Sequence, residues 1–284
     1  AASDVYKRQE STPSAAAESV LEEESTPSAI TESALTAESK PATQYTIDAN
    51  QEVYALLDFE DTAEFENATK GLIASPDTLD IYDENGKLVW SQTAYAFLDQ
   101  DAPDTANPSL WRDTQLNHIY GLFEVTDGIY QVRGYDMSNV TFIKGDTGWI
   151  VVDPLMSVEC AQAALALVEE NLGTFPVKAV IYSHSHVDHF GGVRGIISEE
   201  DVQSGDVQVI APEGFEKYAV SENIYAGTSM GRRASYQYGT LLEAGETGSL
   251  AIGIGMGQSR GSASYISPTL EITQTGEKLS LIHI

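Results

Sequence analysis

Apolar runs separated by tight turns mark the middle of the chain as a set of β-strands. Residues 121–134 (GLFEVTDGIYQVRG) predict two strands around Asp127 and Gly128, and residues 139–154 (NVTFIKGDTGWIVVDP) predict two more around 145–148. Glycine adopts positive φ without strain and aspartate bonds its own backbone, so both favour such turns. The run WIVVD is apolar up to its aspartate, as expected of a buried strand. This region therefore predicts the antiparallel start of a sheet.

A helix and further strands follow. Residues 157–173 (SVECAQAALALVEENLG) predict a helix with Ser157 as its N-cap and an apolar stripe that packs on a sheet. Residues 177–184 (VKAVIYSH) predict a buried strand, and residues 207–212 (VQVIAP) one more, after a short helix that starts near Phe190. A strand, a helix and a strand in this order form a right-handed crossover with parallel strands. The pattern predicts an α/β fold, a mixed sheet covered by helices.

The pattern before this sheet is weaker. Residues 64–75 (EFENATKGLIAS) predict a short amphipathic helix, and residues 78–91 (TLDIYDENGKLVWS) predict a hairpin that turns at 84–87. The proline-bearing residues 101–113 predict an irregular segment anchored by Trp111. We expect residues 45–118 to form an extension that packs on a catalytic domain of residues 119–284.

Residues 1–44 have a different composition, rich in Ala, Ser, Thr, Glu and Pro. The sequence ESTPSA occurs at 10–15 and again at 24–29. Such a segment buries too little apolar surface to offset the entropy of ordering it, so it predicts a disordered tether. Two interpretations stay open: a solvated tail without function, or a spacer behind an export signal or lipid anchor. The second favours an extracytoplasmic location.

Charge and composition exclude several classes of partner. The 284 residues carry a formal net charge of −28, which repels nucleic acid and anionic lipid. An anionic substrate would have to meet local positive charge. The single cysteine, Cys160, rules out a disulfide within the chain and a cysteine-rich zinc ribbon. No apolar run is long enough to predict a transmembrane helix.

Four side chains of metal-ligand type lie within six positions at the end of the predicted strand at 177–184. They are His184, His186, Asp188 and His189. Imidazole and carboxylate suit zinc or another divalent ion. The first two histidines can converge on one ion, and the following aspartate and histidine can face a second beside it. Two such ions can share a bridging hydroxide. The alternative is a set of polar loop residues at the surface.

Asp153 has two interpretations, whereas Cys160 and His118 have a structural one. Asp153 ends the strand WIVVD, where it can orient a metal-bound histidine through a hydrogen bond or act as an acid at a helix N-terminus. Cys160 lies within the predicted helix and reads as a small core residue. His118 has no ligand-type neighbour at a suitable spacing, so we expect it to be structural or exposed.

The motif H-x-H-x-D-H after a buried strand resembles that of the metallo-β-lactamase superfamily, and IVVDP resembles its strand-end aspartate motif. The flanking segments look like the class III alkyl sulfatases of this superfamily. They include NPSLWRDTQLNHIYGLFEVTDGIYQVRGYDMSNV, PVKAVIYSHSHVDHFGGVRGII, IAPEGF and ENIYAGTSMGRRASYQYG. The likeness runs from about Tyr45 to about Gly276. Thr228 and Ser229 depart from it, where relatives carry Asn-Ala.

The resemblance implies an αββα sandwich of which this chain holds the N-terminal part only. It also implies hydrolysis of alkyl sulfate esters to alcohol and inorganic sulfate by a metal-bound hydroxide. His184 and His186 would bind one of two Zn²⁺ ions, and Asp188 and His189 the other, with Asp188 also a catalytic group. Arg232 or Arg233 would bind the sulfate; the alternative is a structural pair.

Part of the ligand set that the resemblance implies is missing. Relatives have bridging carboxylates and a further histidine downstream, whereas the only histidine after His189 is His283. We therefore expect a chain truncated at its C-terminus that alone binds metal weakly, has little activity and exposes apolar surface. A homodimer is expected only in the full-length parent. The alternatives are another dizinc hydrolase, such as a lactonase or thioesterase, and a non-catalytic binding protein.

Overall fold

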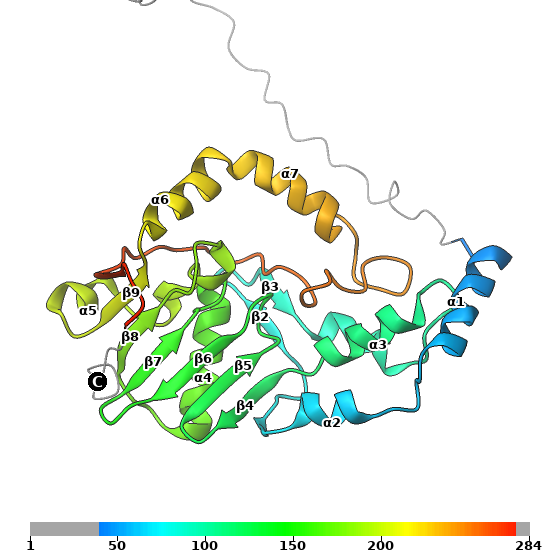
Figure 1. Ribbon diagram of the computed structural model, residues 1–284, viewed down its shortest axis with the longest axis horizontal. Helices are drawn as coiled ribbons and strands as arrows, with labels where there is room; N and C mark the ends of the chain where they lie inside the picture. The colour runs from blue at the N-terminus through cyan, green and yellow to red at the C-terminus, as the bar shows by residue number, and fades with distance from the viewer. Residues whose placement is uncertain (1–39, 277–284) are drawn as a thin grey trace, which may run out of the picture. The chain divides into compact units, whose positions relative to one another are not determined.

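An eight-stranded mixed sheet forms the centre of the fold (Figure 1). The computed structural model describes residues 40–276. Most of the predicted tether at 1–44, and His283, lie outside the described residues. The strands lie in the order β1-β4-β5-β6-β7-β8-β9-β10. Their bounds are β1 Leu72–Ala74, β4 Gly121–Thr126, β5 Ile129–Arg133, β6 Val140–Lys144, β7 Trp149–Val152, β8 Val177–Ile181, β9 Gln208–Pro212 and β10 Leu270–Ile272. Pairing is antiparallel from β1 to β7 and parallel from β7 to β10.

Helices and one hairpin flank this sheet. The hairpin pairs β2 Asp80–Tyr82 with β3 Leu88–Ser91. The α-helices are α1 Gln44–Leu56, α2 Ala63–Thr69, α3 Pro108–Asn117, α4 Val158–Leu172, α5 Glu199–Ser204, α6 Phe215–Val220 and α7 Gly227–Tyr238. Short 3₁₀ or π segments are η2 Thr93–Asp99, η3 Val187–His189, η4 Val193–Gly195 and η5 Ser221–Tyr225.

The expected strands and the crossover helix are confirmed. The turn between β4 and β5 contains Gly128 at φ 75°, the positive value that glycine adopts without strain. The crossover helix α4 has Ser157 as its N-cap, and β8 then pairs in parallel with β7. The apolar stripe of α4 packs on the sheet, with Cys160 fully buried in that interface. The prediction that Cys160 is a core residue is thus confirmed.

Two expected helices differ from the structure. The predicted helix over 64–75 ends at Thr69, and Leu72–Ala74 pair with β4 as an edge strand. The change falls at Gly71, which has φ 78°; a Cβ there would lie 2.2 Å from the carbonyl oxygen of Glu124. The close backbone approach to β4 therefore ends the helix.

The helix expected to start near Phe190 is absent: the 3₁₀ turn η3 ends at His189, and the 3₁₀ turn η4 follows at Val193–Gly195. An α-helix starts only at Glu199, where Ser198 and Asp201 form a capping box. The physical reason is backbone packing between residues 190–195 and the loop that follows β7. A Cβ at Gly192 would lie 2.2 Å from the carbonyl oxygen of Pro154.

The two faces of the sheet are covered differently. The main core lies between α4 and one face, with Phe142, Trp149 and Val180 fully buried. On the other face Ile150, Ala179 and Ile210 form a small cluster, bordered by half-buried neighbours that include Ile143, Ile181 and Leu270. In Figure 1 α4 lies behind the sheet, and no labelled helix crosses its front. Within the described residues this second face is therefore incompletely covered.

Gly192→Ala tests the backbone packing between residues 190–195 and the loop that follows β7. The added Cβ would meet the carbonyl oxygens of Pro154 and Ser157, at 2.2 and 2.6 Å. Overpacking of this kind costs about 1–3 kcal/mol of unfolding free energy. Gly231→Ala is the matched control, because nothing lies within 4 Å of its Cβ in α7 and helix propensity favours alanine. Denaturant unfolding should show a loss for the first variant only; equal stabilities would contradict the packing argument.

Candidate metal centre

The parallel pairing of β7 and β8 brings the predicted ligands to one edge of the sheet. Asp153 follows β7 directly and donates its amide to the carbonyl oxygen of Ile181, the last residue of β8, at 2.9 Å. The chain leaving β8 carries His184 and His186, and η3 then carries Asp188 and His189. Because carboxyl ends of parallel strands meet at one edge, the five side chains gather there.

The imidazole of His184 contacts those of His186 and His189. The ring centroids of His184 and His189 are 4.1 Å apart, and those of His184 and His186 are 4.7 Å apart. Nε2 of His184 lies 3.1 Å from Nδ1 of His186. The histidines of the motif therefore lie together, as the spacing predicted.

His189 lies between two carboxylates. Its Nδ1 is 2.9 Å from Oδ2 of Asp153, and its Nε2 is 3.1 Å from Oδ2 of Asp188. Burial alone would lower the pKa of His189, but the hydrogen bonds to Asp153 and Asp188 outweigh it and raise the pKa to about 9. Without a metal ion, His189 is thus a cation that holds both carboxylates.

The pKa values of His184 and Asp188 shift in the opposite direction to that of His189. Burial, and then the positive charge of His189 and His186, lowers the pKa of His184. Burial would raise the pKa of Asp188, but its hydrogen bond to His189 prevails and lowers it. At neutral pH the cluster therefore offers a neutral imidazole at His184 and a carboxylate at Asp188, which are the forms that bind divalent ions.

Asp153 is held by Ser183, two residues after the end of β8, as well as by His189. Its Oδ1 accepts from the amide of Ser183 at 2.8 Å, and its Oδ2 accepts from the hydroxyl of Ser183 at 2.6 Å. Its backbone has φ 55°, and that of Leu155 has φ 63°, which is rare for a branched side chain and stores strain. Of the two interpretations of Asp153, the structure places it against the histidines.

The donor types at this edge fit zinc, although the side chains bond one another here. Three imidazoles and two carboxylates make up the set, and zinc prefers these ligands. Within residues 40–276, no three His, Cys, Asp or Glu side chains are arranged around one point suitable for an ion. Binding an ion would therefore replace contacts such as that between His184 and His186.

One acidic residue at the cluster has no signal in the sequence. Glu222, in η5, places Oε1 3.5 Å from Nε2 of His186. It lies far beyond the H-x-H-x-D-H motif in sequence, and only the fold brings it close. A carboxylate after a short helix is too common to be singled out from spacing.

Arg232 and Arg233 do not join the histidines. Both lie on α7 and are exposed, and no ion pair found among the described residues includes either one. The face of α7 that carries Gly231, Ala234 and Tyr238 lines a cavity instead. Within residues 40–276, no contact therefore links either arginine to the histidine cluster, and their sulfate-binding role stays a prediction.

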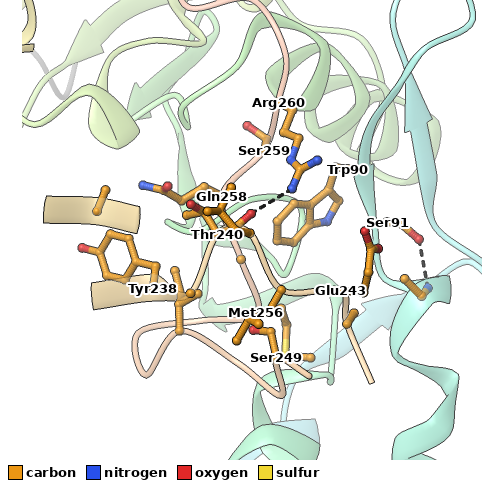
Figure 2. A pocket seen from close by; sticks show the side chains of 18 of the residues that line it. Trp90, Ser91, Tyr238, Thr240, Glu243, Ser249, Met256, Gln258, Ser259 and Arg260 are labelled. Atoms are coloured by element: carbon orange, nitrogen blue, oxygen red, sulfur yellow. Dashed lines mark hydrogen bonds between the residues drawn. The ribbon is translucent and has the colours of Figure 1, made fainter. Parts of the chain in front are cut away.

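That cavity, of about 680 Å³, lies between α7, the hairpin and the segment after α7 (Figure 2). Its walls include Trp90, Tyr238 and Met256, and one arginine, Arg260, which donates to the carbonyl oxygen of Thr240 at 3.3 Å. None of the five cluster side chains lines it. The loop after β7 links the two places, because it begins with Asp153 and its Met156 lines the cavity.

His118 has a structural contact. Its Nδ1 is 2.8 Å from Oε1 of Gln92, a fully buried side chain whose amide nitrogen donates to the carbonyl oxygen of Gly134. Burial lowers the pKa of His118. The prediction of a structural role agrees with this position.

Comparisons with known proteins agree with this fold and edge. A family described as the metallo-beta-lactamase superfamily matches residues 133–268. The chain is similar to this superfamily over those residues, and the curated relatives that it matches are alkylsulfatases. It is 50% identical over 238 residues to a linear primary-alkylsulfatase of Pseudomonas sp., and 47% identical over 237 residues to the alkyl/aryl-sulfatase BDS1 of Saccharomyces cerevisiae.

The structural comparison gives the same group. The stereoselective inverting sec-alkylsulfatase Pisa1 from Pseudomonas sp. superposes with a TM-score of 0.80 at 48% identity, over 84% of this chain and 38% of that chain. The two curated relatives are matched over 83% of this chain but 35% and 37% of their own lengths. The chain thus spans about a third of the relatives. Among the described residues, no helix has the length and apolar character to cross a membrane.

Asp153→Asn tests the electrostatics of the cluster in the metal-free chain. Removing this charge should lower the pKa of His189 from about 9 toward the ordinary range. Because that pKa is raised in the fold, its stabilisation is fully present below about pH 6.5 and is lost as the pH rises through about 9. NMR titration of the His189 ring proton measures the shift, and denaturation at both pH values measures the stability. A folded variant with an unchanged pKa would refute this account.

Proposed function

We propose that this chain carries part of the active site of a zinc-dependent hydrolase of alkyl sulfate esters. The reaction converts the ester and water to an alcohol and hydrogen sulfate. The observation that supports it most is the joint presence of an imidazole and carboxylate cluster at a sheet edge and an alkylsulfatase-like sequence around it. The fold alone would leave the substrate open, because many chemistries occur on it.

Two zinc ions are proposed for the full-length parent. His184 and His186 would hold one, and Asp188 and His189 the other. When bound, such ions polarise water and stabilise negative charge on an oxyanion. His189 is protonated in the metal-free chain, so it must release that proton before a ring nitrogen can serve as a ligand.

The chain's own residues have distinct proposed roles at this edge. Asp153 fixes the ring of His189 through Nδ1, which leaves Nε2 for the side of the cluster that carries Asp188. A carboxylate partner of this kind orients a metal-bound imidazole and raises its basicity. Asp188, kept ionised by His189, would be the anionic catalytic group.

The cavity lined by α7 and the hairpin supports an amphiphilic substrate. An alkyl sulfate has an apolar chain and one negative charge, and the walls combine Trp90, Tyr95 and Met256 with the cation Arg260. Burial of each methylene stabilises binding by about 0.8 kcal/mol. Arg232 and Arg233 remain proposed ligands of the sulfate in the full-length parent, where an arginine can clasp an oxyanion with two donors.

The remaining proposals concern partners and location. The net charge of −28 supports a small molecule rather than nucleic acid as the partner. A homodimer of the full-length parent and an extracytoplasmic location stay proposals. The second is supported by the Ser-, Thr-, Glu- and Pro-rich composition of residues 1–44.

Zinc binding should depend on the clustered histidines and not on His118. His186→Ala removes a donor that contacts His184, so calorimetric titration should show zinc affinity reduced at least 10-fold, the scale expected for disturbing a ligand shell. His118→Ala is the control, because that ring contacts Gln92 instead. Equal losses in both variants would contradict the assignment.

A chimera tests the substrate class. In it, the matched 238 residues of the Pseudomonas primary-alkylsulfatase are replaced by those of this chain. It should release sulfate from dodecyl sulfate, whereas its His186→Ala form should not, and this chain tested alone should release little. A folded chimera that hydrolyses lactones or thioesters but no sulfate ester would favour a different dizinc hydrolase. A chimera that binds zinc without any hydrolysis would favour a binding protein.

A further inference from the structure

A buried carboxylate outside the cluster connects three segments of the chain. Asp136, between β5 and β6, is 3% exposed. Its Oδ1 accepts from the amides of Met137 and Ser259, at 2.8 and 3.2 Å. Its Oδ2 accepts from the amides of Met156 and Ser157, at 3.2 and 3.3 Å, and from the hydroxyl of Ser259 at 2.7 Å. Five donors thus converge on one side chain.

The same segment reaches the metal cluster through Ser138. This serine is 8% exposed, and its hydroxyl donates to the backbone carbonyl oxygen of Asp188. The side chain of Asp188 contacts His189 on the other side. Ser138 therefore fixes the main chain at a proposed ligand without touching any ligand atom.

Asp136 also contacts the loop that begins with Asp153. This loop has positive φ at Asp153 and Leu155, a shape that persists only when its surroundings impose it. The amides of Met156 and Ser157 bonded to Asp136 follow directly. Asp136 is thus an anchor for the strained turn that presents the carboxylate partner of His189.

We propose that Asp136 and Ser138 are positioning residues of the metal centre. They fix the two backbone segments that carry Asp153 and Asp188, so that His189 is held between both carboxylates. The proposal rests on the proposed metal-dependent function of this edge.

A carboxylate is required at position 136 because both of its oxygens accept only. In Asp136→Asn the amide nitrogen would face either the two amides at Oδ1 or the three donors at Oδ2. At least two buried donors would lose their acceptor, which costs about 1–3 kcal/mol each. Ser138→Ala is milder, since it removes one hydrogen bond and adds no conflict.

The first experiment measures metal binding by Ser138→Ala. Co²⁺ is used as a spectroscopic substitute for zinc, and its affinity and visible absorption spectrum are recorded with the full chain. Loss of an outer hydrogen bond that orients a ligand typically lowers metal affinity 10–100-fold, so we expect about 10-fold and an altered spectrum. Ser204→Ala is the matched control: its hydroxyl also donates to a backbone carbonyl, that of Asp201 at 3.0 Å, but in the exposed helix α5.

The second experiment needs no metal. The proton on Nδ1 of His189, shared with Asp153, is followed by NMR in the metal-free chain. Ser138→Ala should shift or broaden this signal, and Ser204→Ala should leave it unchanged. Thermal unfolding of both variants separates positioning from stability, because similar melting temperatures with different His189 signals are expected. Asp136→Asn, where it folds, should show the larger shift.

The outcomes separate the two proposals. If Ser138→Ala matches Ser204→Ala in the His189 signal, Asp136 and Ser138 are not positioning residues, whatever the metal data show. If the wild-type chain binds no Co²⁺ but Ser138→Ala still moves the His189 signal, the positioning of His189 stands and metal binding by this chain alone is refuted; the chimera then tests the metal-dependent function. If both the signal and the Co²⁺ affinity change, both proposals are supported.

Discussion

The parallel pairing of β7 with β8 is the constraint on which the site depends. It aligns the ends of two strands that are joined through α4, so that Asp153 and the H-x-H-x-D-H segment meet. A shift of one residue in this register would turn Asp153 to the opposite face of the sheet. The apolar interface between α4 and the sheet, with Trp149 and Val180 fully buried, makes such a shift unfavourable. The packing of the core therefore also determines the geometry of the site in this fold.

The charges at the edge balance one another before any ion arrives. His189 carries a proton between Asp153 and Asp188, which removes the repulsion that two adjacent carboxylates would otherwise have. The chain has a net charge of −28, so its electrostatic potential is already negative. Without this cation, the two carboxylates would add uncompensated negative charge to it. In the proposed metal centre a divalent ion would supply the positive charge that this proton supplies here, so the proton keeps the proposed ligands together.

The sequence predicted the parts of the molecule that local pattern determines. The strands around Gly128 and the helix that begins after Ser157 followed from periodicity, and the proximity of His184 to His186 followed from spacing. The helix expected to start near Phe190 is absent, because close backbone contacts such as that of Gly192 with Pro154 determine that segment. Glu222 could not be found because its proximity to the histidines exists only in three dimensions. The hydrogen bonds of Asp136 are likewise non-local, since Ser259 is more than a hundred residues away.

The candidate metal centre and the cavity are built from different parts of the polypeptide. Gly191 and Gly192 meet the loop after β7 through main-chain atoms, and Ser264 bonds the carbonyl oxygen of Gly191. The cavity wall is formed largely by side chains of α7, the hairpin and the segment around Met256. Side chains can be exchanged one at a time, whereas main-chain contacts are common to most sequences that adopt the fold. Under the proposed function, substitutions in the cavity wall can therefore change substrate preference gradually while the candidate metal centre keeps its shape.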